Sequence, residues 1–207
     1  MRRDSLYCRQ SCRQAAHRFG RALALRERAG LPLRLAYADP PYPGKAHLYR
    51  DHPDYGGEVD HLELLSRLHE YDGWALSTSS SGLRQVFALC DSLGILHVRV
   101  AAWVRGARTT PAAGPLSSWE PVVYRGARQA PRNNQVLDSL VYTARPRLTD
   151  PCRVIGAKPA AYISWIFGLL DARVGDTLDD LYPGSGGVQR AWELVCERRS
   201  VQDLAQP

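Results

Sequence analysis

The residues best suited to chemistry form a tetrad, Asp39-Pro40-Pro41-Tyr42, which directly follows an apolar run over residues 31–38. An apolar run that stops at an acid, two prolines and an aromatic is typical of a buried parallel strand whose carboxyl end carries a site. Asp39 can accept a hydrogen bond from an amino group, and Pro40 can present a carbonyl that Pro41 holds outward. Tyr42 offers a flat face for stacking a planar ring. These roles together suit chemistry on an exocyclic amine, although an ordinary proline-rich turn is the alternative for the tetrad alone.

A second candidate site lies near the C-terminus, where a predicted strand over residues 177–181 enters a glycine-rich turn. A helix is predicted to follow from Val188 to about Arg198. Glycines at such a turn let the backbone approach a ligand closely. The turn and the acid before it comprise Asp180, Leu181, Tyr182, Pro183, Gly184, Ser185 and Gly186, and Lys158-Pro159 stands upstream.

Together the two stretches resemble the DNA amino-methyltransferases that use S-adenosylmethionine. The tetrad resembles their catalytic motif. The segment from Asp180 to Gly186 resembles their Asp-x-Phe-x-Gly-x-Gly cofactor motif, with Tyr182 at the Phe position. Lys158-Pro159 resembles the Lys-Pro pair of the helix that packs beside the cofactor. The catalytic motif comes before the cofactor motif, which resembles the permuted, beta-type order of that family, and the resemblance spans roughly residues 31–198.

The resemblance implies an α/β, Rossmann-like fold in permuted order. The strand–helix alternation of the sequence likewise predicts a mostly parallel sheet with helices on both faces. The resemblance implies catalytic roles for Asp39, Pro40, Pro41 and Tyr42. It implies cofactor binding by Asp39, Lys158, Pro159, Asp180, Leu181, Tyr182, Pro183, Gly184, Ser185 and Gly186.

The implied reaction moves a methyl group from S-adenosylmethionine to the N6 amine of adenine in DNA. The lone pair of that amine is delocalised into the ring, so hydrogen bonds to the Asp39 carboxylate and the Pro40 carbonyl would localise it. Tyr42 would stack on a base swung out of the duplex. Because the sulfonium of the cofactor is itself the activated group, no metal is expected. An aspartate at the first motif position favours adenine over cytosine; the alternatives are an N4-cytosine methyltransferase and a non-catalytic nucleic-acid-binding protein on the same scaffold.

Length and composition indicate one soluble domain. The chain has 207 residues and a net charge of +6, and no apolar run approaches the ~20 residues needed to cross a bilayer. A cytoplasmic location without a membrane partner is therefore expected. Nearly every cation is arginine, since Lys45 and Lys158 are the only lysines. Arginine suits phosphate and guanine edges and favours DNA as a partner, but codon bias in a GC-rich genome would give the same enrichment.

The cysteines do not indicate a disulfide framework or a complete metal site. They stand at positions 8, 12, 90, 152 and 196, an odd number, as expected in a reducing cytosol. Cys8, Cys12 and His17 resemble half of a small zinc-binding segment, but a structural zinc needs four ligands, so a metal-free helix start is favoured. His47 and His52 have no acid cluster at ligand spacing, and no metal site is predicted.

The other elements follow a basic helical arm over residues 1–30. Strands are predicted at 33–38, 74–78, 95–104 and 119–124, and helices at 58–71, 83–93 and 160–170. The long loop over 39–57 follows the tetrad and is expected to cover the site. Residues 31–207 would form the methyltransferase domain, with a catalytic half at 31–126 and a cofactor-binding half at 154–207.

The segment between the two halves, residues 127–153, is polar and rich in arginine. Related permuted enzymes place target-recognition material there, and Arg and Asn make bidentate contacts to guanine and adenine. A solvated linker is the alternative. The candidate nucleic-acid contacts are Lys45, Arg50, Arg128, Arg132, Asn133, Arg145 and Arg147.

One departure from the family pattern follows the glycine-rich turn. Related enzymes continue with a helix and then a second strand ending in an acid that binds the cofactor ribose, whereas only residues 188–207 follow the turn here. Residues 201–204 are a poor strand, and neither Asp203 nor Glu197 is a convincing substitute for the acid. The sheet is therefore expected to be truncated beside the cofactor. The chain could be a small independent methyltransferase, one part of an assembly with a protein partner or further copies of itself, or a DNA-binding relic.

Overall fold

The computed structural model describes residues 14, 17–18, 20–22, 31–50, 56–106, 115–128, 136–143 and 158–204, with side chains to residue 197. Most of the predicted basic arm lies outside the described residues. So do Cys8, Cys12, His52 and four candidate nucleic-acid contacts, namely Arg132, Asn133, Arg145 and Arg147. No described helix is long and apolar enough to span a membrane.

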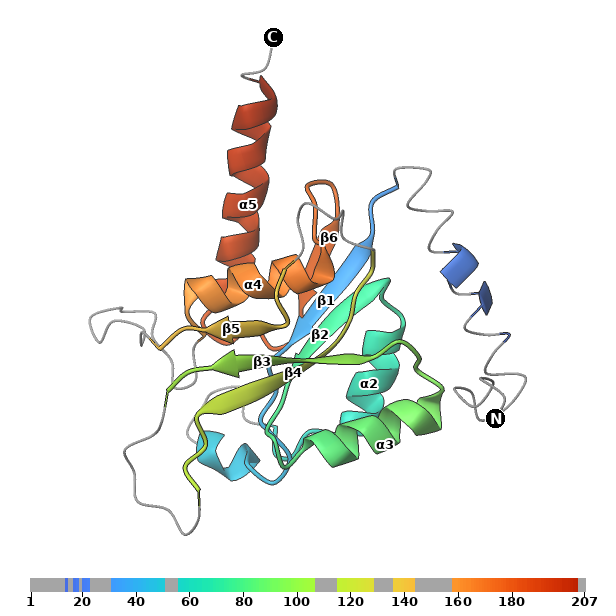
Figure 1. Cartoon of the computed structure of the whole chain (residues 1–207), viewed down its shortest axis with the longest axis vertical. Coiled ribbons are helices and arrows are strands. Elements are labelled where there is room, and N and C mark those ends of the chain that lie inside the picture. Colours follow the sequence, from blue (N-terminus) through green and yellow to red (C-terminus); the bar gives the residue numbers. More distant parts are fainter. Residues whose placement is uncertain are drawn as a thin grey trace.

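Six strands form one sheet in the order β5-β3-β4-β2-β1-β6 (Figure 1). They are β1 (Arg34–Ala38), β2 (Gly73–Ser77), β3 (Arg99–Val104), β4 (Trp119–Arg125), β5 (Ser139–Val141) and β6 (Thr177–Asp180). Strand β1 is parallel to both β2 and β6, and β5 is parallel to β3, whereas β4 runs antiparallel between β2 and β3. The predicted α/β fold with a mostly parallel sheet is thus confirmed.

The helices are η1 (Ala46–Tyr49), α2 (His61–His69), α3 (Leu83–Leu93), α4 (Ala160–Leu170) and α5 (Gly187–Leu204). Helix α2 begins after Asp60, whose carboxylate accepts hydrogen bonds from the first amides of the helix, at Leu62 and Glu63. The predicted bounds of α3 and α4 are confirmed. Helix α5 continues through residues 201–204, where the sequence suggested a poor strand.

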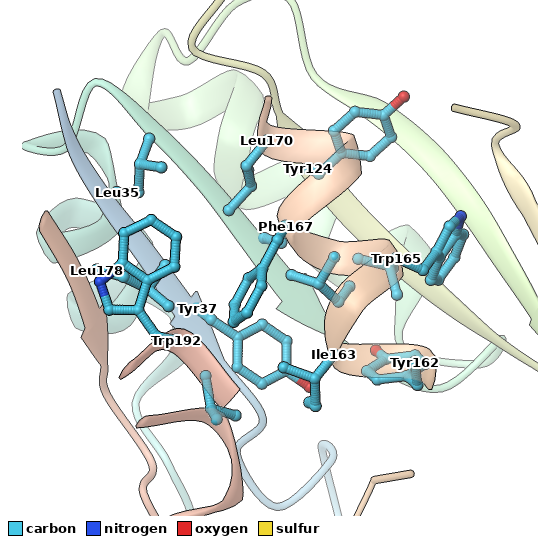
Figure 2. Close-up of a cluster of buried hydrophobic side chains, with 14 of the residues drawn as sticks. Leu35, Tyr37, Tyr124, Tyr162, Ile163, Trp165, Phe167, Leu170, Leu178 and Trp192 are labelled. Atoms are coloured by element: carbon cyan, nitrogen blue, oxygen red, sulfur yellow. The ribbon is translucent and has the colours of Figure 1, made fainter. Parts of the chain in front are cut away.

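The alternation of side chains along β1 divides the core between the two faces of the sheet. Leu35 and Tyr37 pack in one cluster with residues of α4 and α5, whereas Ala36 and Ala38 pack in another with residues of α2 and α3. Figure 2 shows the first cluster, in which aromatic rings of α4 and α5 lie over β1. Helices therefore cover both faces of β1, which leaves the edge at its carboxyl end for a site.

Two features of the sheet differ from the prediction. Strand β5 lies within the segment expected to be irregular, and its three residues are too few for a two-residue hydrophobic period to be recognised. Strand β3 begins at Arg99 rather than at residue 95. The reason is that His97 adopts a left-handed backbone conformation with φ of 62°, which interrupts the extended chain.

Candidate active site

The tetrad and the glycine-rich turn meet at one edge of the sheet. Strands β1 and β6 are parallel neighbours, with Tyr37 opposite Asp180. The Leu181 amide continues the pairing and donates a hydrogen bond to the Tyr37 carbonyl at 2.9 Å. Because parallel strands end at the same edge, Asp39 and the turn after Asp180 lie next to each other.

A cavity of about 690 Å³ opens at this edge, within the range of small-molecule sites. Helix α2 forms another wall of the cavity through Glu63, Leu64 and Arg67. The predicted site residues that line it are Asp39, Pro41, Lys158, Asp180, Leu181, Tyr182, Pro183, Gly184 and Ser185. Four predicted residues are not in the lining: Pro40 and Pro159 are buried, the Tyr42 hydroxyl accepts a hydrogen bond from Lys158, and Gly186 has a left-handed backbone conformation in the turn.

Lys158 joins the cofactor-side motif to the tetrad. Its side chain is only 10% exposed, and its ammonium lies 3.2 Å from Asp39 Oδ1, from Glu120 Oε2 and from the Tyr42 hydroxyl. The resemblance implied a place beside the cofactor for this lysine. Its position just before α4 also brings it into direct contact with the proposed catalytic aspartate.

Glu120 contacts the tetrad but was not among the predicted catalytic or cofactor-binding residues. It accepts a hydrogen bond from the Tyr42 hydroxyl at 2.9 Å, and it forms ion pairs with Lys158 and, at 2.9 Å, with Arg105. Glu120 stands near the beginning of β4. Since β4 is antiparallel to β2, its beginning lies at the edge where the parallel strands end. The signal in the sequence was Trp119-Glu120-Pro121, which resembles a Glu-Pro signature late in the catalytic half of related enzymes, but only the direction of β4 brings Glu120 to the tetrad.

The pKa values of Asp39, Glu120 and Lys158 depend on one another. Burial raises the pKa of Asp39, and the Lys158 ammonium limits that rise. Burial would raise the pKa of Glu120 as well, but Lys158, the Tyr42 hydroxyl and Arg105 together hold it below its usual value. Burial disfavours the charged form of Lys158, yet its acidic neighbours raise its pKa well above that of a free lysine. The cluster therefore holds a charged lysine between two acids.

Three buried hydroxyls lie beneath the tetrad. The Ser77 hydroxyl is 2.8 Å from the Tyr37 hydroxyl and 2.8 Å from the Tyr162 hydroxyl. Burial raises the pKa of Tyr162 to about 12, so this phenol stays protonated at neutral pH. A hydrogen bond from Ser77 also favours the ionised form of Asp39 and lowers its pKa. The network fixes the floor of the site from β1, β2 and α4 together.

The glycine-rich turn places an acid and exposed backbone at the cavity. Asp180 Oδ1 accepts a hydrogen bond from the Tyr182 amide at 3.2 Å, whereas Oδ2 is buried with no hydrogen-bond partner among the described residues. Burial raises the pKa of Asp180 to about 6. Gly184 and Gly186 have φ of 45° and 71°, a left-handed conformation that favours glycine.

The candidate nucleic-acid contacts fall into three groups. Lys45 and Arg50 are exposed in the segment after the tetrad, next to the site. The Arg128 side chain is only 6% exposed and forms a two-pronged ion pair with Asp176 at 2.6 and 2.7 Å, so the structure shows a contact within the fold, and its contact with DNA stays a prediction. The other four lie outside the described residues. No group of His, Cys, Asp and Glu suited to a metal occurs in the described part of the chain.

Comparison with known proteins identifies the fold. No family model and no curated protein sequence matches the chain. The crystal structure of the M1.HpyAVI–SAM complex aligns over 86% of either chain, with a TM-score of 0.55 and 14% sequence identity. The crystal structure of M1.HpyAVI aligns over 86% of this chain and 84% of that one, with a TM-score of 0.51 and 12% identity. The chain thus has the Rossmann-like fold of these structures.

Proposed function

We propose that this protein is a DNA methyltransferase that transfers a methyl group from S-adenosylmethionine to the N6 amine of adenine. The observation that carries the proposal is a single cavity that Asp39 and the glycine-rich turn line from neighbouring parallel strands. The shared fold with the M1.HpyAVI–SAM complex supports the same cofactor.

The residues of the cavity fit this cofactor. S-adenosylmethionine is positively charged at its sulfonium and at its amino group, and the carboxyl groups of Asp39 and Asp180 line the cavity. Asp180 Oδ2, without a partner among the described residues, is an acceptor that a bound cation would satisfy. Gly184 and Ser185 would hold the cofactor through their backbone. When bound, the cofactor supplies a methyl group already activated by the sulfonium.

The tetrad would prepare the target amine. The Asp39 carboxylate and the Pro40 carbonyl accept its two hydrogens, which localises the nitrogen lone pair for attack on the methyl group. Asp39 can then take the proton that the methylated nitrogen releases, because burial has raised its pKa. The Tyr42 ring stacks on the base, and the hydrogen bond from its hydroxyl to Glu120 fixes the plane of the ring. The alignment of amine and methyl donor supplies much of the acceleration.

Calorimetry and product analysis together test the proposal. Titration with S-adenosylmethionine should give saturable heat with the wild-type protein. Incubation with tritiated cofactor and mixed-sequence DNA, followed by nucleoside mass spectrometry, should then yield N6-methyladenine. If the product is N4-methylcytosine, the protein is an N4-cytosine methyltransferase instead. Binding of cofactor and DNA without any product, also with candidate protein partners, would favour a non-catalytic scaffold.

A further inference from the structure

One oxygen of the Asp39 carboxylate, the proposed acceptor for the target amine, already binds a side chain of the protein. Asp39 Oδ1 receives the Lys158 ammonium at 3.2 Å. An ammonium has three protons, and the structure supplies three oxygen acceptors at 3.2 Å, on Asp39, Glu120 and Tyr42. The same ammonium lies 5.6 Å from the ring centroid of Tyr42, the residue proposed to stack on the base.

We propose that Lys158 stands in for the target amine on Asp39, and that Glu120 is the positioning residue that retains the ammonium when the base displaces it. This inference rests on the proposed function, because it assumes that an amine of a base binds Asp39. On displacement, Lys158 gives up one of its three acceptors and keeps two, Glu120 Oε2 and the Tyr42 hydroxyl.

The surroundings of Glu120 suit this role. Its other oxygen, Oε1, forms an ion pair with Arg105 at 2.9 Å, and Oε2 faces Lys158 and Tyr42. Two carboxylates and two cations make the cluster neutral, and the entry of a neutral base leaves that balance unchanged. Without Glu120, displacement would leave a buried ammonium with only a hydroxyl acceptor, which is costly in a site of low polarity. Glu120 thus allows the Lys158 ammonium to leave Asp39 when the base binds and to return when the base leaves.

The lysine composition of the chain allows a direct test on the wild-type protein. Lys45 and Lys158 are the only lysines, so ¹⁵N-lysine labelling gives two side-chain ammonium signals in NMR spectra. Titration with 2′-deoxyadenosine, and separately with 2′-deoxycytidine, should move the Lys158 signal and leave that of exposed Lys45 in place. A Lys158 signal that stays constant with both nucleosides contradicts the proposal. This readout needs no methyl transfer, whereas absence of heat with S-adenosylmethionine contradicts the proposed function instead.

Glu120 could retain the Lys158 ammonium or have a merely structural role, and the kinetics of a double substitution distinguish the two. Glu120→Gln should raise the KM for DNA about tenfold, the equivalent of one charge-assisted hydrogen bond, with a smaller effect on kcat. Adding Lys158→Met to Glu120→Gln should return the KM to the wild-type range, because the competing ammonium is gone. The matched control, Glu70→Gln at the exposed end of α2, should leave both constants unchanged. An unchanged KM in Glu120→Gln, or a raised KM that Lys158→Met does not restore, overturns the proposal.

Discussion

The hydroxyl and the ring of Tyr42 have different proposed roles, which substitutions can separate. Tyr42→Ala removes both, and its catalytic efficiency should fall roughly ten- to a hundredfold, since stacking contributes about 1–3 kcal/mol per base. Tyr42→Phe keeps the ring and loses only the hydrogen bonds with Glu120 and Lys158, so it should be milder. Tyr71→Phe, which loses a hydroxyl bonded to Asp179, is the control and should behave as wild type. An equal loss in both Tyr42 variants would exclude stacking as the main role of the ring.

The raised pKa of Asp180 predicts how cofactor binding depends on pH. Burial raises the pKa of this carboxyl to about 6, so Asp180 is largely protonated at pH 5 and ionised at pH 7. Only the ionised form attracts a cation, and affinity for S-adenosylmethionine should therefore increase from pH 5 to pH 7. Calorimetry at several pH values would measure this. Asp180→Asn should bind S-adenosylmethionine more weakly at pH 7 and lose most of the pH dependence. If the affinity of the wild-type protein does not change between pH 5 and pH 7, Asp180 does not bind the cofactor.

At the scale of the elements, the ion pair between Arg128 and Asp176 ties the turn before β6 to its neighbours. Asp176 also accepts hydrogen bonds from the backbone amides of Leu33 and Arg173. Burial alone would raise the pKa of Asp176, but Arg128 and these amides hold it below its usual value. The pair therefore stabilises the fold at neutral pH, and this contribution is lost as the pH falls through the lowered pKa of the carboxyl.

Arg128→Met should consequently lower the free energy of unfolding by about 3 kcal/mol, because it leaves a buried carboxylate without its cation. Chemical denaturation measures this directly. Arg99→Gln breaks the exposed pair of Arg99 and Asp138, whose side chains are 66% and 61% exposed, and should cost at most about 1 kcal/mol. A destabilisation of Arg128→Met no larger than that of this control would show that the buried pair does not stabilise the fold.

The same residues show how far the sequence alone can predict the fold and the site. Long hydrophobic patterns predicted the bounds of α3 and α4. An apolar run that ends at the tetrad predicted β1. The pairing of Arg128 with Asp176 was not predicted, because a local pattern of arginines does not reveal a partner that lies far along the chain. Glu120 was not among the predicted site residues for a related reason: its place at the site depends on the antiparallel direction of β4, which only the sheet as a whole determines.

At the scale of the whole molecule, the net charge of +6 predicts salt-sensitive binding to DNA. Lys45 and Arg50, both exposed, follow the tetrad and are the described cations best placed to contact phosphates beside the site. Replacing both with Gln should flatten the log–log dependence of affinity on salt by roughly 0.9 for each lost contact. Fluorescence anisotropy with a labelled duplex would measure the slope.

A charge-matched control is available at the opposite edge of the sheet. Arg34 and Arg99 stand at the beginnings of β1 and β3, away from the carboxyl ends that form the cavity. Their joint replacement by Gln removes the same net charge and should leave the slope of the salt dependence nearly unchanged. Equal flattening in both double variants would mean that general charge, rather than contact near the site, determines the affinity for DNA.

In the proposed mechanism, Asp39 polarises the target amine during methyl transfer from S-adenosylmethionine. The most direct measurement compares tritiated methyl transfer to mixed-sequence DNA by wild type, Asp39→Asn, Asp39→Ala and the control Asp179→Asn, with cofactor affinity measured alongside. Both Asp39 variants should lose roughly a hundredfold or more in rate at saturating cofactor. Asp39→Ala removes the acceptor for the amine, whereas Asp39→Asn keeps a carbonyl acceptor but loses the carboxylate that takes the proton. Asp179, bonded to Tyr71 outside the cavity, should be dispensable for transfer. Transfer by an Asp39 variant at the wild-type rate would contradict the mechanism.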